Sequence, residues 1–393
     1  MQDEKGGAPL RLGIGQMKDT RELQSVRYKA DPLSIPSTLS QFERVIISVA
    51  VPAKVQSRTG AAMTHYAPID VHAHYFPQSF LDLIAKHGPS HGFEYKIVDG
   101  KGPQFKHGHL LTGPVGPKFV DLDARLEAMD EQGVEVHALS LSQPMVYWAD
   151  GDLAQGISET YNDTLAQAHG RHPKRLVGLA TLPMHEPALA VKEVERAARL
   201  PGMRGFYIAT QIRGKDLSDA SFLPVYERIE ASGLPLFLHP VEVIGHQRLA
   251  AYYLTNLLGN PFESAIAAAH LIFGGVLDRF PKLVVCLPHA GGAFPWLVGR
   301  LNRGWEKRAD LKHVKHSPLE YLRRFYYDTV GYSDHVLDYL VKVIGADRVL
   351  MGSDYCFPIA YEQPVKIVAD HPGLDAEAKR KIVEANAYRL LKL

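Results

Sequence analysis

Ile69-Asp70-Val71-His72-Ala73-His74 is the stretch that decides the fold of this 393-residue chain, because a short apolar run ends in two imidazoles two positions apart. Side chains at positions i and i+2 of a β-strand point to the same face of the sheet. Both rings can therefore converge on one metal ion. Two ligands rarely hold a catalytic ion, so we expect further nitrogen or carboxylate ligands at the ends of other strands.

Apolar, strand-like runs alternate with amphipathic helical patterns from residue 67 onward, which is typical of βα units that build a parallel sheet. Eight such strands are predicted, at 69–72, 134–140, 176–181, 205–209, 234–239, 283–289, 325–329 and 349–354. The predicted helices include 121–132, which stops at Gly133, and 152–170. Eight units favour a closed (β/α)8 TIM barrel of the α/β class, with 375–393 as a closing helix.

Two segments fall outside this alternation. Residues 76–119 are rich in Gly, Pro, His and Lys and are longer than an ordinary connection, so we expect an insertion or a lid near the barrel mouth, after the first strand. Residues 1–62 differ in composition from the rest of the chain. The predicted domains are therefore an N-terminal extension over 1–62 and a barrel over 63–393.

Charge and composition restrict the partners of the chain. Lys and Arg total 44 against 43 Asp and Glu, so no strong field attracts nucleic acid or an anionic membrane, and a small-molecule partner is expected. No stretch reaches the roughly 18 consecutive apolar residues of a membrane span, and no basic segment leads into an apolar signal core. The two cysteines, Cys286 and Cys356, do not indicate a disulfide framework, and a cytoplasmic location is expected.

Polar residues that end apolar runs are the candidates for chemistry, because the active site of a (β/α)8 barrel forms at the C-terminal ends of its strands. Five residues occupy such positions: His72, His74, His239, His289 and Asp354. A single one would more often be a hydrogen-bonded structural residue or a helix cap. Five together, on strands one, five, six and eight, favour a metal site.

His289 begins a His-Ala-Gly-Gly turn whose small residues leave the imidazole exposed to the ion. Such a ring can take a proton from metal-bound water and return it later. Arg300 follows in the next helix and suits a carboxylate substrate, although the sequence slightly favours an ordinary surface arginine. A second His-x-His, His107-Gly108-His109, has no apolar strand before it and is interpreted as surface or lid.

Ordered motifs along residues 67–393 resemble the amidohydrolase superfamily, and within it the decarboxylase group typified by 2-amino-3-carboxymuconate 6-semialdehyde decarboxylase. The motifs are Asp70 to His74, Arg125 to Asp130, Gly178 to Pro183, Leu238 to Pro240, Gly274 to Leu283, His289 to Arg300 and Gly352 to Tyr355. The resemblance implies a divalent ion, zinc or else manganese, that is held by His72, His74, His239 and Asp354. It also implies His289 as the catalytic acid/base beside Asp354, and a homodimer in which Arg300 reaches the neighbouring subunit's site.

The activity that the resemblance implies is non-oxidative decarboxylation of a small unsaturated or aromatic carboxylic acid. A metal-bound water or a substrate oxygen would occupy the open site of the ion, and His289 would move the proton. Hydrolysis or hydration by the same site is the alternative, and a binding protein without catalysis is a third reading. Two substrate-contacting positions differ, because an arginine of the group falls on Gly113 and a tryptophan on Val241. A related but different acid is therefore expected.

Overall fold

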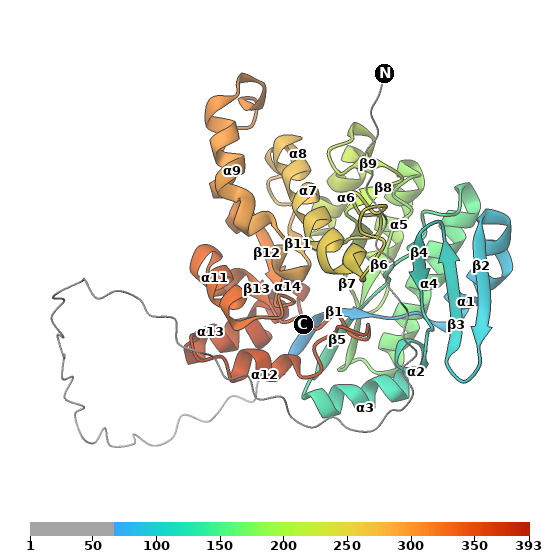
Figure 1. The fold of residues 1–393 in the computed structure, drawn as a ribbon. Helices are drawn as coiled ribbons and strands as arrows, with labels where there is room; N and C mark the ends of the chain where they lie inside the picture. Colours follow the sequence, from blue (N-terminus) through green and yellow to red (C-terminus); the bar gives the residue numbers. More distant parts are fainter. Residues whose placement is uncertain (1–66) are drawn as a thin grey trace, which may run out of the picture. The chain divides into compact units, whose positions relative to one another are not determined.

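Eight parallel strands form the central sheet in a computed structural model that describes residues 67–393. The strands follow the order β1 (Ile69–His74), β5 (Val136–Ser140), β6 (Leu176–Thr181), β7 (Met203–Ala209), β10 (Leu236–His239), β11 (Val285–Leu287), β12 (Phe325–Asp328) and β13 (Val349–Leu350). The ring closes between β1 and the segment after β13, where Val71 N donates to Met351 O at 3.0 Å and Asp354 N donates to His72 O at 2.9 Å. The predicted (β/α)8 barrel is confirmed (Figure 1). The extension expected over 1–62 lies outside the described residues.

Helices cover the outside of the barrel (Figure 1). They are α3 (Leu122–Gln132), α4 (Gly151–Arg171), α5 (Pro187–Ala197), α6 (Leu223–Ser232), α7 (Asn260–Phe273), α8 (Val276–Arg279), α9 (Phe294–Lys307), α10 (Pro318–Tyr321), α11 (Asp334–Ile344), α12 (Pro364–Ala369), α13 (Ala376–Arg380) and α14 (Asn386–Leu391). The α3 helix begins where the Asp121 side chain accepts from Asp123 N at 2.8 Å, and it ends at Gly133 with φ 70°, as predicted. None of the helices in residues 67–393 has the length and apolarity that a membrane crossing needs.

The core is made by strands that are buried on both faces. Every residue of β1, β5 and β6 is buried, which explains why β6 is a nearly continuous apolar run, whereas β1 alternates between apolar and buried polar side chains. Large side chains such as Phe206 and Phe325 are fully buried, and each burial of this kind contributes about 1.5–3 kcal/mol to stability. The closed, packed sheet gives the residues at its C-terminal edge a rigid base.

The insertion between β1 and β5 has elements of its own. It contains α1 (Gln78–His87), the antiparallel strands β2 (Phe93–Val98), β3 (Gly102–His107) and β4 (Leu110–Thr112), and α2 (Pro117–Val120). A further short hairpin, β8 (Gln211–Ile212) and β9 (Lys215–Asp216), follows β7. In the turn after β3, His109 Nε2 lies 3.3 Å from Glu242 Oε2, and the His109 ring stacks on His246 at 3.9 Å. The tip of the insertion therefore lies against the segment that follows β10, as a lid at the barrel mouth requires.

Three barrel strands end earlier than predicted, and one of them, β12, does so by a single residue, at Asp328. The β11 strand stops at Leu287 and β13 at Leu350, so His289 and Asp354 lie in the turns that follow. Both residues have left-handed backbones, with φ 56° and 65°. A non-glycine residue in this conformation costs about 1–3 kcal/mol and persists where its surroundings hold it in place. Turn geometry, rather than the pleat of a strand, therefore aims these two side chains.

Candidate metal centre

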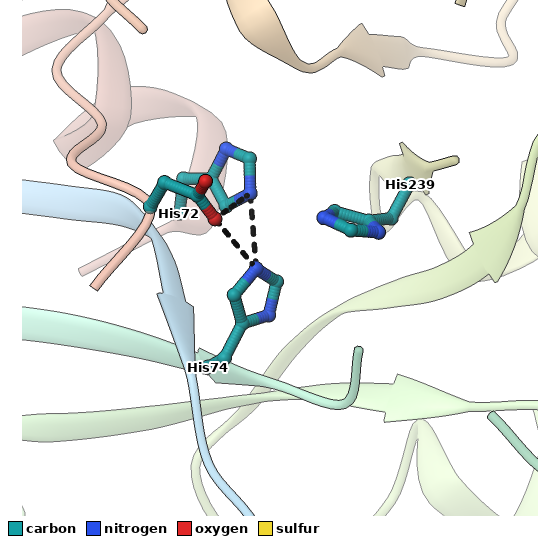
Figure 2. A group of neighbouring side chains, drawn as sticks. His72, His74 and His239 are labelled. Atoms are coloured by element: carbon teal, nitrogen blue, oxygen red, sulfur yellow. Dashed lines mark hydrogen bonds and ion pairs between the residues drawn. The ribbon is translucent and has the colours of Figure 1, made fainter. Parts of the chain in front are cut away.

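Four of the five strand-end candidates meet at one point. Donor atoms of four buried residues all lie within 4.8 Å of one another: His72, His74, His239 and Asp354. Asp354 Oδ1 is 3.1 Å from His74 Nε2 and 3.4 Å from His72 Nε2. Figure 2 shows the rings of His72, His74 and His239 turned toward a common space. The structure therefore brings the four predicted ligands together from three different strand ends.

The donor set fits a divalent cation. Three imidazole nitrogens and one carboxylate oxygen are ligands that zinc and manganese both accept. Burial lowers the pKa of His74 and of His239 well below the usual value, and neighbouring charges on histidine act in the same direction. Both rings are therefore neutral near pH 7 and offer a lone pair. The Nε2 atoms of His72 and His74 are only 3.1 Å apart, a separation that a shared proton or a shared cation satisfies.

Asp328, the last residue of β12, lies behind His72. Its Oδ2 is 2.7 Å from His72 Nδ1. Burial acts to lower the pKa of His72, but the hydrogen bond to Asp328 and the charge of Asp354 outweigh it and raise the pKa to about 9. Burial likewise opposes ionisation of Asp328, yet the hydrogen bond from His72 holds the pKa of that carboxyl below its usual value. An ionised Asp328 thus orients the ring so that Nε2 faces the other ligands.

Sequence reasoning did not select Asp328. The available signal was its position, because it is the polar residue next to the end of the predicted strand 325–329 and it ends β12 in the structure.

His289 lies beside the four-residue cluster. Its ring centroid is 5.3 Å from that of His72 and 5.6 Å from that of His239, and its Nδ1 has no hydrogen-bond partner among residues 67–393. Desolvation and the charge on His72 lower the pKa of His289, so the ring is neutral near pH 7. A neutral ring with an unpaired nitrogen next to a cation site can accept a proton from a group bound there and pass it on.

Buried hydrogen bonds hold β1, the strand that carries two of the predicted ligands. Asp70 accepts hydrogen bonds from His72 N at 2.9 Å and from Ser353 N at 3.2 Å, and it also accepts one from the Ser353 hydroxyl. The fully buried Arg125 donates to the carbonyl oxygen of His74. These bonds tie β1 to the segment that closes the barrel and to α3. Neither Asp70 nor Arg125 was predicted as a site residue, although both belong to the sequence motifs.

The remaining candidates lie away from the cluster. Arg300 is exposed on α9 and forms no hydrogen bond or ion pair with any of residues 67–393. The Cys356 thiol donates to Lys118 O at 3.4 Å and does not join the ligand group. His107 ends β3, a strand with a single buried residue, and neither it nor His109 belongs to the cluster.

Known proteins are similar to this chain in sequence and in structure. The chain is 32% identical over 337 residues to the 2-amino-3-carboxymuconate-6-semialdehyde decarboxylase of Dictyostelium discoideum, covering 83% of this chain and 91% of that protein. It is 29% identical over 293 residues to the gamma-resorcylate decarboxylase of Polaromonas sp. (strain JS666), covering 69% and 87%. The crystal structure of 5-carboxyvanillate decarboxylase from Sphingomonas paucimobilis superposes with a TM-score of 0.73 at 27% identity, covering 84% and 99%. Residues 69–393 match the amidohydrolase family, and the chain belongs to that family.

Proposed function

We propose that this protein is a metal-dependent, non-oxidative decarboxylase, a carboxy-lyase that acts on a small unsaturated or aromatic carboxylic acid. The observation that carries the proposal is the meeting of three imidazoles and one carboxylate at the barrel mouth, with His289 beside them. The relatives named for decarboxylation of 2-amino-3-carboxymuconate 6-semialdehyde and of gamma-resorcylate support the same reaction class.

Non-oxidative decarboxylation breaks a carbon–carbon bond, releases carbon dioxide and leaves an electron pair on carbon, which must take up a proton. A divalent ion in this site would supply positive charge next to the electron-rich substrate. His289 starts neutral, accepts a proton from substrate or water, and delivers it to the carbon that loses the carboxylate. Asp354 assists this transfer, because its negative charge favours the protonated form of His289 while the ring carries the proton.

Zinc is proposed as the resident ion and manganese as the alternative, because the ligand set of three imidazoles and one carboxylate suits both. A cytoplasmic location is also proposed, and the two free thiols of Cys286 and Cys356 support it.

Arg300 is proposed to bind the substrate carboxylate in the neighbouring subunit of a homodimer. Its guanidinium is exposed on α9, and Trp296, one turn earlier on the same helix, is 77% exposed. A twofold contact through this face would bury the indole and direct Arg300 away from its own barrel. A bidentate guanidinium suits the planar carboxylate of the proposed substrate.

Release of carbon dioxide tests the proposed reaction. Protein loaded with zinc or with manganese is incubated with a panel of unsaturated and hydroxylated aromatic acids, and bound metal is measured in parallel. We expect at least one acid to release carbon dioxide in a metal-dependent manner. Hydrolysis or hydration without carbon dioxide would favour the other chemistry of this family, and a protein that takes up no divalent ion would refute the proposal.

A further inference from the structure

We propose that Asp328 is a positioning residue that couples the metal site to the acid/base, because one carboxylate fixes both the tautomer of His72 and the turn that carries His289. The part of this inference that concerns kinetics rests on the proposed function. The part that concerns metal binding does not, since ion affinity is measured without a substrate.

The carboxylate of Asp328 is saturated with donors. Its Oδ2 accepts from His72 Nδ1 at 2.7 Å and from His289 N at 3.1 Å. Its Oδ1 accepts from Ala290 N at 2.8 Å and from Val330 N at 3.0 Å. An ionised carboxylate offers about four lone-pair sites and no proton of its own. The ionised carboxylate can therefore accept from all four donors, whereas a protonated carboxyl or an asparagine amide in its place cannot.

The first of these bonds decides which nitrogen of His72 is free. Because Nδ1–H donates to Asp328, Nε2 is the nitrogen that offers a lone pair to a cation once it gives up its proton, and it faces Asp354 Oδ1 at 3.4 Å. Gly352 lets Asp328 and His72 approach the backbone closely, since a Cβ at this glycine would lie 3.0 Å from the Cβ atoms of both residues.

The bonds to the backbone hold the other side of the site. Residues 289–292 all have left-handed backbones, with φ values of 56°, 55°, 78° and 57°. The first two are His289 and Ala290, for which this conformation is unfavourable. Both donate their N–H groups to Asp328, so the carboxylate offsets the strain that aims the His289 ring. A change at Asp328 should therefore reach the metal ligand and the acid/base together.

Asp328→Asn tests this coupling because the amide keeps the shape of the side chain but places an NH2 group where one oxygen accepted. If the NH2 faces His72 and His289, the His72 ring must adopt the tautomer with its proton on Nε2, the atom that faces the ligands. If the NH2 faces Ala290 and Val330, two backbone donors lose their acceptor and the turn is disturbed. The first orientation reverses the hydrogen bond to His72 and leaves His289 N without its acceptor, whereas the second removes the acceptor of Ala290 N and Val330 N.

The matched control is Thr329→Val at the next residue. The Thr329 hydroxyl donates to Gly352 O at 3.0 Å and accepts from Gly352 N at 3.1 Å. Valine removes both buried bonds without changing a group that bonds to His72 or His289. The control thus reports what the loss of buried hydrogen bonds at the end of β12 does to stability alone.

Affinities for Zn²⁺ and Mn²⁺ are measured by chelator competition on the wild-type protein and both variants, together with thermal unfolding. We expect Asp328→Asn to bind both ions about 10- to 100-fold more weakly, and Thr329→Val to bind them as the wild type does. At saturating metal, Asp328→Asn should still show a reduced kcat with little change in KM. Wild-type metal affinity in Asp328→Asn, or an equal loss in Thr329→Val, would overturn the inference.

A second measurement decides the matter if Asp328→Asn does not fold. In the zinc-loaded wild-type protein, imidazole NMR should show a slowly exchanging proton on Nδ1 of His72, assigned through its loss in His72→Gln. A proton on Nε2 instead would refute the positioning role.

The inference about Asp328 and the proposed function can be refuted separately. A variant with weakened metal binding in a protein that decarboxylates no acid contradicts only the proposed function, whereas decarboxylation with unchanged metal affinity contradicts only the coupling.

Discussion

Replacement of His289 by asparagine isolates the acid/base from the structure around it. Asparagine tolerates the left-handed backbone at φ 56° better than alanine does. It also keeps the backbone N–H that donates to Asp328 at 3.1 Å. The variant therefore loses the titratable ring while the turn stays in place.

The expected loss in turnover follows from the chemistry of the ring. A positioned general acid/base contributes about 10²- to 10⁴-fold to a rate. At about 1.36 kcal/mol per factor of ten, this corresponds to roughly 2.7–5.4 kcal/mol of transition-state stabilisation. The adjacent rings of His72 and His239 are proposed ligands and cannot replace His289 as proton carriers. Because His289 is outside the four-ligand group, the variant should bind metal stoichiometrically.

The assay compares carbon dioxide release, bound metal and thermal unfolding in the wild type, His289→Asn and Ala290→Gly. The glycine variant changes the same turn but keeps the imidazole and the Ala290 N–H that donates to Asp328 at 2.8 Å. We expect its turnover to stay within a few-fold of the wild type. More than about a tenth of wild-type turnover in His289→Asn, or loss of its metal, would show that the ring is not the acid/base.

Three further outcomes are expected. Removal of the metal with a chelator should abolish turnover. An ion returned at 100 times its Kd should restore turnover and stabilise the fold by about 2.7 kcal/mol, which is measured as a higher Tm. Full activity of the metal-free protein would contradict the proposed metal site. If Arg300 acts across a dimer, an equal mixture of inactive His289→Asn and Arg300→Ala subunits should recover about one quarter of wild-type activity after exchange, whereas no recovery would place Arg300 outside the partner's site. Gly292→Ala should lose at least about 2 kcal/mol in urea unfolding, because its φ is 57° and a Cβ would lie 2.1 Å from Pro261 O; wild-type stability would mean that the turn relaxes freely.

Burial explains which elements of the fold could be predicted from the sequence. The β6 strand is buried throughout, so its six residues form an apolar run that has the same bounds in sequence and structure. The β2 strand instead has one buried residue, Phe93, among exposed and half-buried ones, and Gly102 and Pro103 open β3. An exposed antiparallel ribbon of this kind has no long apolar run, and its composition is that of a loop.

The same reasoning separates the site residues that were found from those that were missed. His72 and His74 are two residues apart on one strand, so the pleat alone predicts that they converge. Asp328 also ends a strand, but a carboxylate in that position equally suits a helix cap, and its partner His72 is 256 residues away. Arg125 belongs to a sequence motif, but its role could not be predicted, because its burial follows from how α3 packs under β1.

The position of Gly113 supports the expectation that the substrate of this chain differs from that of its relatives. The ligands lie on or next to the closed barrel, whereas Gly113 lies in the insertion, just after β4. Its φ is 98°, and a Cβ there would lie 2.7 Å from Pro103 O and 2.9 Å from Val115 N. No side chain fits, so an arginine cannot be restored by a single substitution without rebuilding the backbone. The resemblance aligns an arginine with this position, so we expect an acid whose second substituent differs from that of the acid bound by the arginine.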